Sequence, residues 1–337
     1  MTMATGNGVP EVERIRASLE AWLGGLWDES TLRVTSLEPF GSGHSGATHL
    51  ATVQSARGSE EFVVRTSVPG VKLSGPNDVG RQGRVMAALW SEGAPVPRVH
   101  AIEPDAAIAD RAVVVLERVV GDDWCTVADS EGHRAVGEAA VRGLQRLRET
   151  PSGLLSAILG TAESPTEELA RWFGLLERSE SESAGKAKRV FDRLVDDEPS
   201  NTPQGLVHGD FHYGNLLFRG GEVVAVLDWE IASHGPSLSD LGSLAVASMR
   251  RRYGDPNPTG DVDIRLDELA ALYGVEHDDA AWFIAAACVK YAAIIAYNLR
   301  LHRSGRKHDP IYEALVGTVP CLLDDASDIV EHGLSDL

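Results

Sequence analysis

The sequence predicts an α+β protein of two lobes, a small strand-rich lobe followed by a larger, mainly helical one. Its 337 residues exceed what a single hydrophobic core usually serves, so two compact units are expected. Strand-like apolar runs separated by glycine-containing turns gather before residue 120, whereas apolar residues at helical spacing prevail after residue 129. We therefore expect a boundary near Gly121, with lobes at 1–120 and 121–337.

The periodicity places the elements in order. In the first lobe it predicts a helix at 11–26, strands at 32–37, 49–54, 61–66 and 112–120, a helix at 78–90 and a proline-bounded extended segment at 94–99. In the second lobe it predicts helices at 129–149, within 163–197, from 237 onwards, and at 267–272, 278–303 and 311–328.

The most informative stretch runs from residue 206 to residue 240. Apolar runs at 216–218 and 223–227 flank the turn Arg219-Gly220-Gly221-Glu222, the pattern of a β-hairpin whose glycines supply the turn. His208, Asp210 and Asn215 precede the first strand, and Asp228 ends the second. The hairpin is expected to bring these side chains to one edge, although Asp and Asn also commonly shape tight turns. A carboxamide and carboxylates suit a hard divalent cation such as Mg²⁺.

This stretch resembles the catalytic core of the aminoglycoside phosphotransferase-like kinases, which have a two-lobed protein-kinase-like fold. His208-Gly209-Asp210 through Asn215 is similar to their catalytic loop, and Asp228 to their metal-binding aspartate. The resemblance implies that Asp210 accepts the acceptor hydroxyl's proton, that His208 positions the loop, and that Asn215 and Asp228 hold Mg²⁺ on the nucleotide phosphates.

The nucleotide-binding residues follow from the same resemblance. The glycine-rich turn between the first two strands would cover the phosphates through Gly41, Ser42, Gly43 and Ser45. Arg65 stands where kinases carry a phosphate-binding Lys, a substitution that resembles the branch of kinase-like domains related to those fused to some acyl-CoA dehydrogenases. The backbone around Glu117 to Val119 would pair with the base of ATP or GTP.

One residue departs from that branch. An Arg-Glu pair is typical where this chain has Arg81-Gln82. Gln82 can hydrogen-bond Arg65 but brings no charge. Asp240, further along the chain, resembles an aspartate that braces the catalytic loop, and an N-cap role is equally consistent with its position.

The net charge and the cysteines of the chain limit which binding partners and compartment are expected. The net charge of -19 argues against nucleic acid, and acidity either favours a cationic acceptor or simply maintains solubility. Cys125, Cys288 and Cys321 lack metal-ligand spacing and are expected to be reduced thiols of a cytoplasmic protein. The N-terminus has no signal-peptide pattern, and the apolar stretch 280–297 is interrupted by Lys290, so a buried core helix is expected rather than a membrane span.

The sequence thus predicts an ATP- or GTP-dependent, Mg²⁺-requiring O-phosphotransferase that acts on a small-molecule hydroxyl, as a monomer or homodimer. The acceptor is either an antibiotic such as an aminoglycoside, which would imply antibiotic resistance, or a hydroxylated metabolite. The alternative is a pseudokinase that binds a nucleotide or metabolite without transfer, for which Gln82 is the reason. A protein substrate is disfavoured because the segment after Asp228 is too short for a peptide-docking loop.

Overall fold

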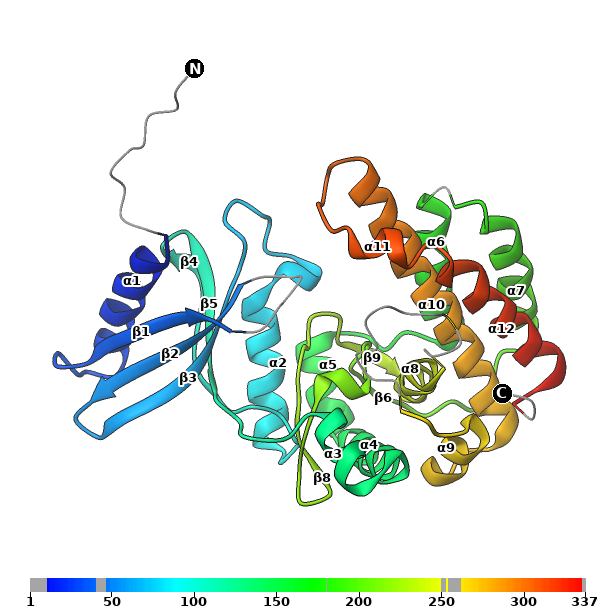
Figure 1. Ribbon diagram of the computed structural model, residues 1–337, viewed down its shortest axis with the longest axis horizontal. Helices are drawn as coiled ribbons and strands as arrows, with labels where there is room; N and C mark the ends of the chain where they lie inside the picture. The colour runs from blue at the N-terminus through cyan, green and yellow to red at the C-terminus, as the bar shows by residue number, and fades with distance from the viewer. Residues whose placement is uncertain (1–10, 41–46, 180, 250–252, 254–261, 335–337) are drawn as a thin grey trace. The chain divides into compact units, whose positions relative to one another are not determined.

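The computed structural model describes residues 11–40, 47–179, 181–249, 253 and 262–334. By its internal contacts the chain divides into two compact units, one of residues 1–120 with 229–231 and one of residues 121–228 with 232–337 (Figure 1).

The N-terminal unit is built on a five-stranded antiparallel sheet with the strand order β1-β2-β3-β5-β4. Its strands are β1 (Arg33–Pro39), β2 (Ala47–Ser55), β3 (Gly58–Thr66), β4 (Val99–Ile108) and β5 (Arg111–Glu117). Its helices are α1 (Glu11–Leu26), the short 3-10 helix η1 (Gly75–Asn77) and α2 (Val79–Ser91).

Helices cover both faces of this sheet. Successive side chains of a strand point to opposite faces, so Val113 and Val115 of β5 share one face and join the core cluster that includes Leu19 of α1. Val114 faces α2, where a Cβ added to Gly83 would lie 2.7 Å from its Cγ2. The close approach of α2 therefore requires glycine at position 83, and cover on both faces explains why β5 is apolar from Ala112 to Leu116.

The C-terminal unit is mainly helical. Its helices are α3 (Trp124–Glu131), α4 (His133–Arg148), α5 (Ser152–Leu159), α6 (Pro165–Arg178), α7 (Ala184–Asp196), α8 (Ser239–Ser248), α9 (Leu266–Tyr273), α10 (His277–Arg303), α11 (Ile311–Ala314) and α12 (Thr318–His332). Two antiparallel strand pairs complete it: β6 (Gln204–Val207) with β9 (Ser233–Pro236), and β7 (Leu216–Arg219) with β8 (Glu222–Val226). The short 3-10 helix η2 (Tyr213–Asn215) leads into β7.

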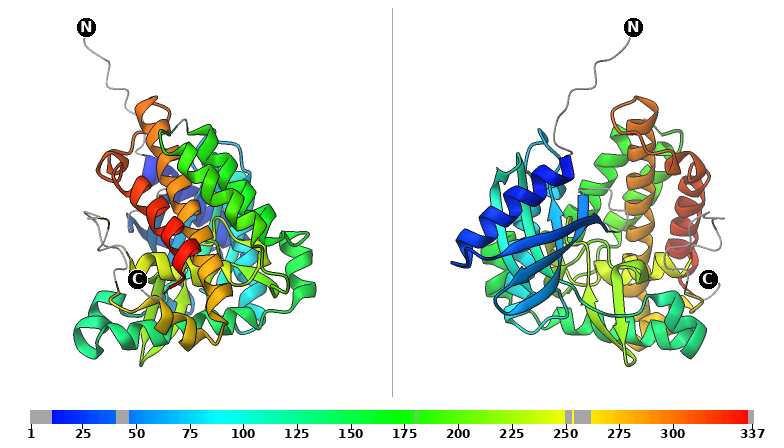
Figure 2. Two further views of the ribbon diagram at one scale, coloured as in Figure 1. Left: turned by 90° about the vertical axis from the view of Figure 1, so that its right-hand side faces the viewer. Right: turned by 60° about the vertical axis from the view of Figure 1, so that its left-hand side comes forward.

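Helix α10 is the central element of this unit and packs against α6, α8 and α12 (Figure 2). Among the described residues it is the one helix long and apolar enough to cross a membrane, and 72% of its most apolar window is buried inside the fold. This burial agrees with the expectation that the stretch forms a core helix.

The predicted fold class is confirmed, and so is the hairpin, whose Gly220 and Gly221 have φ values of 59° and 76°. Several element predictions differ from the structure: β4 and α5 were not predicted, and the helix expected at 129–149 is divided at Gly132 into α3 and α4. The single helix expected at 311–328 is broken into α11 and α12, because Gly317 precedes a new first turn in which Pro320 is tolerated. The pairing of β6 with β9 was missed, since each strand has only four residues and its partner is distant in sequence.

Candidate active site

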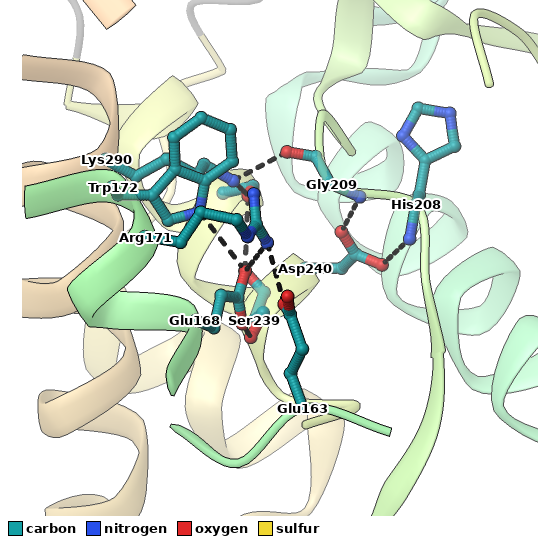
Figure 3. Close-up of polar contacts among 10 residues, drawn as sticks. Glu163, Glu168, Arg171, Trp172, His208, Gly209, Ser239, Asp240 and Lys290 are labelled. Atoms are coloured by element: carbon teal, nitrogen blue, oxygen red, sulfur yellow. Dashed lines mark hydrogen bonds and ion pairs between the residues drawn. The ribbon is translucent and has the colours of Figure 1, made fainter. Parts of the chain in front are cut away.

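Asp240, in the first turn of α8, holds the backbone of the loop that follows β6. Its Oδ2 accepts the N–H of His208 at 2.6 Å, and its Oδ1 accepts the N–H of Gly209 at 2.8 Å (Figure 3). The N-cap of α8 is Leu238, so Asp240 braces the loop rather than capping the helix. Gly209 has a φ of 87°, in the left-handed region that glycine adopts without strain, so the brace depends on glycine here.

His208 is fully buried and joins the loop to the hairpin. Its Nδ1 accepts the N–H of Asp210 at 3.1 Å, which assigns the ring proton to Nε2, and Nε2 then donates to the carbonyl of Leu227 at 2.8 Å. Burial lowers the pKa of His208, against the opposing charges of Asp240 and Asp210. His208 is therefore a neutral positioning residue that links the start of the loop to the residue before Asp228.

Asn215 closes the other end of the loop. Its Nδ2 donates to the carbonyl of Asp210 at 2.9 Å, and its own carbonyl accepts the N–H of Leu227 at 2.8 Å. Both backbone polar groups of Leu227 are thus bound by the loop of residues 208–215, one by His208 and one by Asn215. The hairpin and the loop are therefore joined next to Asp228 by the hydrogen bonds of Leu227.

Asp228 follows β8 with a φ of 64°, an unusual conformation for a residue other than glycine. The left-handed region costs such a residue roughly 1–2 kcal/mol, so the surrounding bonds must hold it there. The carboxylate of Asp228 and the carboxamide oxygen of Asn215 are hard oxygen donors suited to Mg²⁺. Across the part of the chain that the structure describes, no group of three or more His, Cys, Asp or Glu forms a metal cage. A two-ligand protein site is what Mg²⁺ uses when substrate phosphates supply the rest.

The Asp210 carboxylate is oriented by three side chains. Tyr291 of α10 donates its hydroxyl to Oδ1 at 2.9 Å, while His212 Nε2 and Asn215 Nδ2 each lie 3.4 Å from Oδ2. Burial raises the pKa of Asp210, but His212, Lys290 and His208 outweigh it, and the pKa lies well below its usual range. The Asp210 side chain keeps 31% of its surface exposed, so the carboxylate can still meet a further donor.

A buried lysine supports the loop from the side of α10. Lys290, 2% exposed, donates to the carbonyl of Gly209 and to Ser243 Oγ, each at 2.6 Å (Figure 3). Burial lowers the pKa of Lys290, while the carboxyl groups of Glu168 and Asp240 oppose that shift. The ammonium therefore belongs to one buried cluster with two acidic side chains.

Glu168 of α6 is the second acidic member. Ser239 donates its hydroxyl to Oε2 at 2.5 Å, Trp172 donates Nε1 to Oε1 at 3.4 Å, and Arg171 lies 4.0 Å from Oε1. Burial raises the pKa of Glu168 and the charge of Lys290 opposes it. Sequence reasoning missed Glu168 and Tyr291 altogether. Lys290 alone had a signal in the sequence, because it is a lysine within an otherwise apolar stretch.

The predicted nucleotide-binding residues belong to the N-terminal unit. Arg65 lies on β3, opposite Thr48 of β2 and Val114 of β5. Gln82, 1% exposed on α2, donates Nε2 to the carbonyl of Pro76 at 2.8 Å, and its Oε1 has no hydrogen-bond partner among the described residues. The suggested hydrogen bond between Gln82 and Arg65 is therefore not formed.

Glu117 ends β5, and its N–H is already bound to the carbonyl of Arg98 at 2.8 Å. Val119 lies beyond the end of that strand. Gly41, Ser42, Gly43 and Ser45 lie outside the described residues.

Comparison with known proteins identifies the family of this chain. The model of the phosphotransferase enzyme family matches residues 36–281. Among curated proteins, the chain is 28% identical over 219 residues to a probable acyl-CoA dehydrogenase of Arabidopsis thaliana, covering 60% of this chain and 27% of that one. It is 29% identical over 261 residues to the rat acyl-CoA dehydrogenase family member 11, covering 73% of this chain and 33% of that one. The chain thus spans a third or less of these relatives.

Solved structures share the fold. A proposed aminoglycoside phosphotransferase from Ralstonia eutropha aligns with a TM-score of 0.73 at 19% identity, over 94% of this chain and 98% of that one. The choline kinase LicA from Streptococcus pneumoniae aligns with a TM-score of 0.59 at 13% identity, over 91% of this chain and 97% of that one.

The fold and the loop define a protein of the kinase-like phosphotransferase class. Because the family model covers most of its length, the chain belongs to the phosphotransferase enzyme family. The expected relation to the kinase-like domains of acyl-CoA dehydrogenase family members is confirmed by its curated relatives.

Proposed function

We propose that this protein transfers the terminal phosphoryl group of ATP or GTP to a hydroxyl group of a small molecule, giving a phosphate monoester and a nucleoside diphosphate. The observation that carries the proposal is the lock between the catalytic loop and the hairpin, in which Leu227 is bound by both His208 and Asn215. That lock fixes Asp210, Asn215 and Asp228 within one segment of one unit.

Asp210 is the residue that receives the acceptor's proton. Its low pKa keeps it ionised at neutral pH but also makes it a weak base. It therefore orients the hydroxyl and takes the proton late, as the hydroxyl oxygen bonds to phosphorus and loses basicity. This suits a loose transition state, in which positioning and electrostatic stabilisation provide most of the catalysis.

The other roles follow from the donor types. Asn215 and Asp228 would hold Mg²⁺, which supplies charge neutralisation on the nucleotide phosphates. Arg65 would contact the phosphates, the turn with Gly41, Ser42, Gly43 and Ser45 would cover them, and the backbone of Glu117 and Val119 would meet the base. Gln82 replaces an acidic partner without restoring its charge, so Arg65 would be held by other groups.

The acceptor we favour is a hydroxylated metabolite with an acyl chain. The relation to acyl-CoA dehydrogenase family members supports it, together with Arg65. An aminoglycoside or other antibiotic is the second candidate, and the net charge of -19 supports it through attraction of a cationic acceptor. The three cysteines are free thiols, which supports work in a reducing compartment such as the cytoplasm.

The test is transfer of labelled γ-phosphate from ATP and from GTP, with and without Mg²⁺, to a panel of hydroxyacyl compounds, aminoglycosides and other hydroxylated antibiotics. An Asp210→Asn variant runs beside the wild type. Acceptor-dependent label that needs Mg²⁺ and falls by orders of magnitude in the variant is the expected result. Nucleotide binding in a thermal-shift assay with no transfer to any acceptor would instead favour a pseudokinase.

A further inference from the structure

Tyr291 makes the shortest side-chain hydrogen bond to the Asp210 carboxylate. Its hydroxyl lies 2.9 Å from Oδ1, within the ordinary range for an O–H donor. The contacts of His212 and Asn215 with Oδ2 are both 3.4 Å, beyond the range in which N–H···O bonds are strong. The direction of the carboxylate is therefore set more by Tyr291 than by the loop itself.

The helix that carries Tyr291 is held tightly against the loop. The neighbouring Lys290 donates to the carbonyl of Gly209 at 2.6 Å, one residue before Asp210. Val289, Ala292 and Ala293 on the same turn of α10 are fully buried, so the helix cannot rotate without breaking its packing. Consecutive residues of α10 thus bind consecutive residues of the loop: the Lys290 ammonium donates to the main-chain carbonyl of Gly209, and the Tyr291 hydroxyl donates to the side chain of Asp210.

A carboxylate has about four lone-pair positions, so one phenol does not saturate it. Asp210 keeps 31% of its side-chain surface exposed, which leaves room for a further donor. An acceptor hydroxyl must meet this carboxylate in a defined direction for the in-line transfer that such kinases perform. An aspartate side chain can rotate about two bonds, and the Tyr291 hydroxyl, together with the longer contacts of His212 and Asn215, restricts that rotation.

We propose that Tyr291 is a positioning residue of the phosphoryl transfer, fixing the Asp210 carboxylate from α10 so that its open side receives the acceptor hydroxyl. The proposal rests on the phosphotransferase function proposed above. It adds to the reaction a residue that lies 81 positions from Asp210 in the sequence.

The experiment compares Tyr291→Phe with the wild type in the labelled-phosphate assay, using the acceptor found there. Phenylalanine keeps the ring and removes only the hydroxyl. We expect kcat to fall about tenfold to a hundredfold, the loss that follows removal of a hydrogen bond to a charged group. KM for the nucleotide and the melting temperature should stay close to wild type, which a merely structural role would not predict.

Tyr297→Phe is the matched control. Tyr297 lies on the same helix, and its hydroxyl makes no hydrogen bond within the part of the chain that the structure describes, so loss of that hydroxyl should leave kcat within twofold of wild type. A Tyr291→Phe kcat that is also within twofold would overturn the proposal. So would a fall in kcat matched by a lower melting temperature and a raised nucleotide KM. If the wild type transfers no phosphate, the proposed function itself fails and Tyr291 has no reaction to position.

Discussion

Replacing Lys290 by Met tests the buried cluster behind the catalytic loop. The variant keeps an apolar side chain of similar length but removes the ammonium that bonds to Gly209 and Ser243 at 2.6 Å. The carboxyl groups of Glu168 and Asp240 then stay buried without their cation. Breaking a buried charge cluster by removing one partner costs about 3–5 kcal/mol. Because whole proteins are stable by about 5–15 kcal/mol, this is a large share of the free energy of unfolding.

The assay is urea unfolding combined with hydrogen exchange of the loop amides. We expect the free energy of unfolding to fall by about 3–5 kcal/mol, and exchange at Gly209 to accelerate by roughly two to four powers of ten. Lys188→Met on α7 is the control, since that lysine is 54% exposed and pairs with Asp192 on the surface. Its loss should cost less than about 0.5 kcal/mol.

Two results would refute this reasoning. A Lys290→Met variant that loses no more stability than Lys188→Met would mean that the cluster does not hold the loop. The second comes from the double variant with Glu168→Gln, which removes one buried acid together with the lysine. If the two changes are coupled through charge, the double variant should lose less stability than the sum of the single ones, by about 0.5–3 kcal/mol. Strict additivity would show that Glu168 and Lys290 act independently.

Three further outcomes are expected. Gly242→Ala should destabilise the protein by about 1–3 kcal/mol, because a Cβ there would lie 2.3 Å from the carbonyl oxygen of Phe283 and force α8 away from α10; thermal unfolding checks it, and Gly185→Ala, which meets nothing within 4 Å, should not destabilise. Burial lowers the pKa of His208, so as the pH falls the histidine is protonated in the unfolded chain before it is protonated in the folded one. The contribution of the neutral His208 to stability should therefore be complete above its ordinary pKa of 6.5. Below that pH the free energy of unfolding should fall by up to about 1.4 kcal/mol per pH unit. Urea midpoints at pH 7.5 and 5.5 measure this loss of stability. The expectation would be contradicted by a His208→Gln variant whose midpoint differs between the two pH values as much as the wild-type midpoint does. Asp228→Ala should raise the Mg²⁺ concentration needed for half-maximal transfer and lower kcat by orders of magnitude, whereas an unchanged Mg²⁺ titration would remove Asp228 from the metal site.

Local sequence was enough for the hairpin and for the order of the residues at its edge. Gly220 and Gly221 adopt the positive φ values that the turn needs, and the apolar runs on either side of the turn form the two paired strands. Asp210, Asn215 and Asp228 lie within nineteen residues of one another, so short-range geometry brings them together. The family followed from the same segment, because catalytic spacing is a local property.

Only the tertiary structure could identify the groups that hold this segment in place. Lys290 and Tyr291 reach the loop across 81 positions of the chain, and Glu168 approaches Lys290 from α6 through a buried cluster. The spacing of residues along the sequence does not predict these contacts, because they depend on which faces of α6, α8 and α10 pack together. In the sequence, Lys290 is visible as a lysine within an apolar helix, but its partners depend on how the helices pack. The sequence determined the chemistry of the site, and long-range packing decided its orientation and its support.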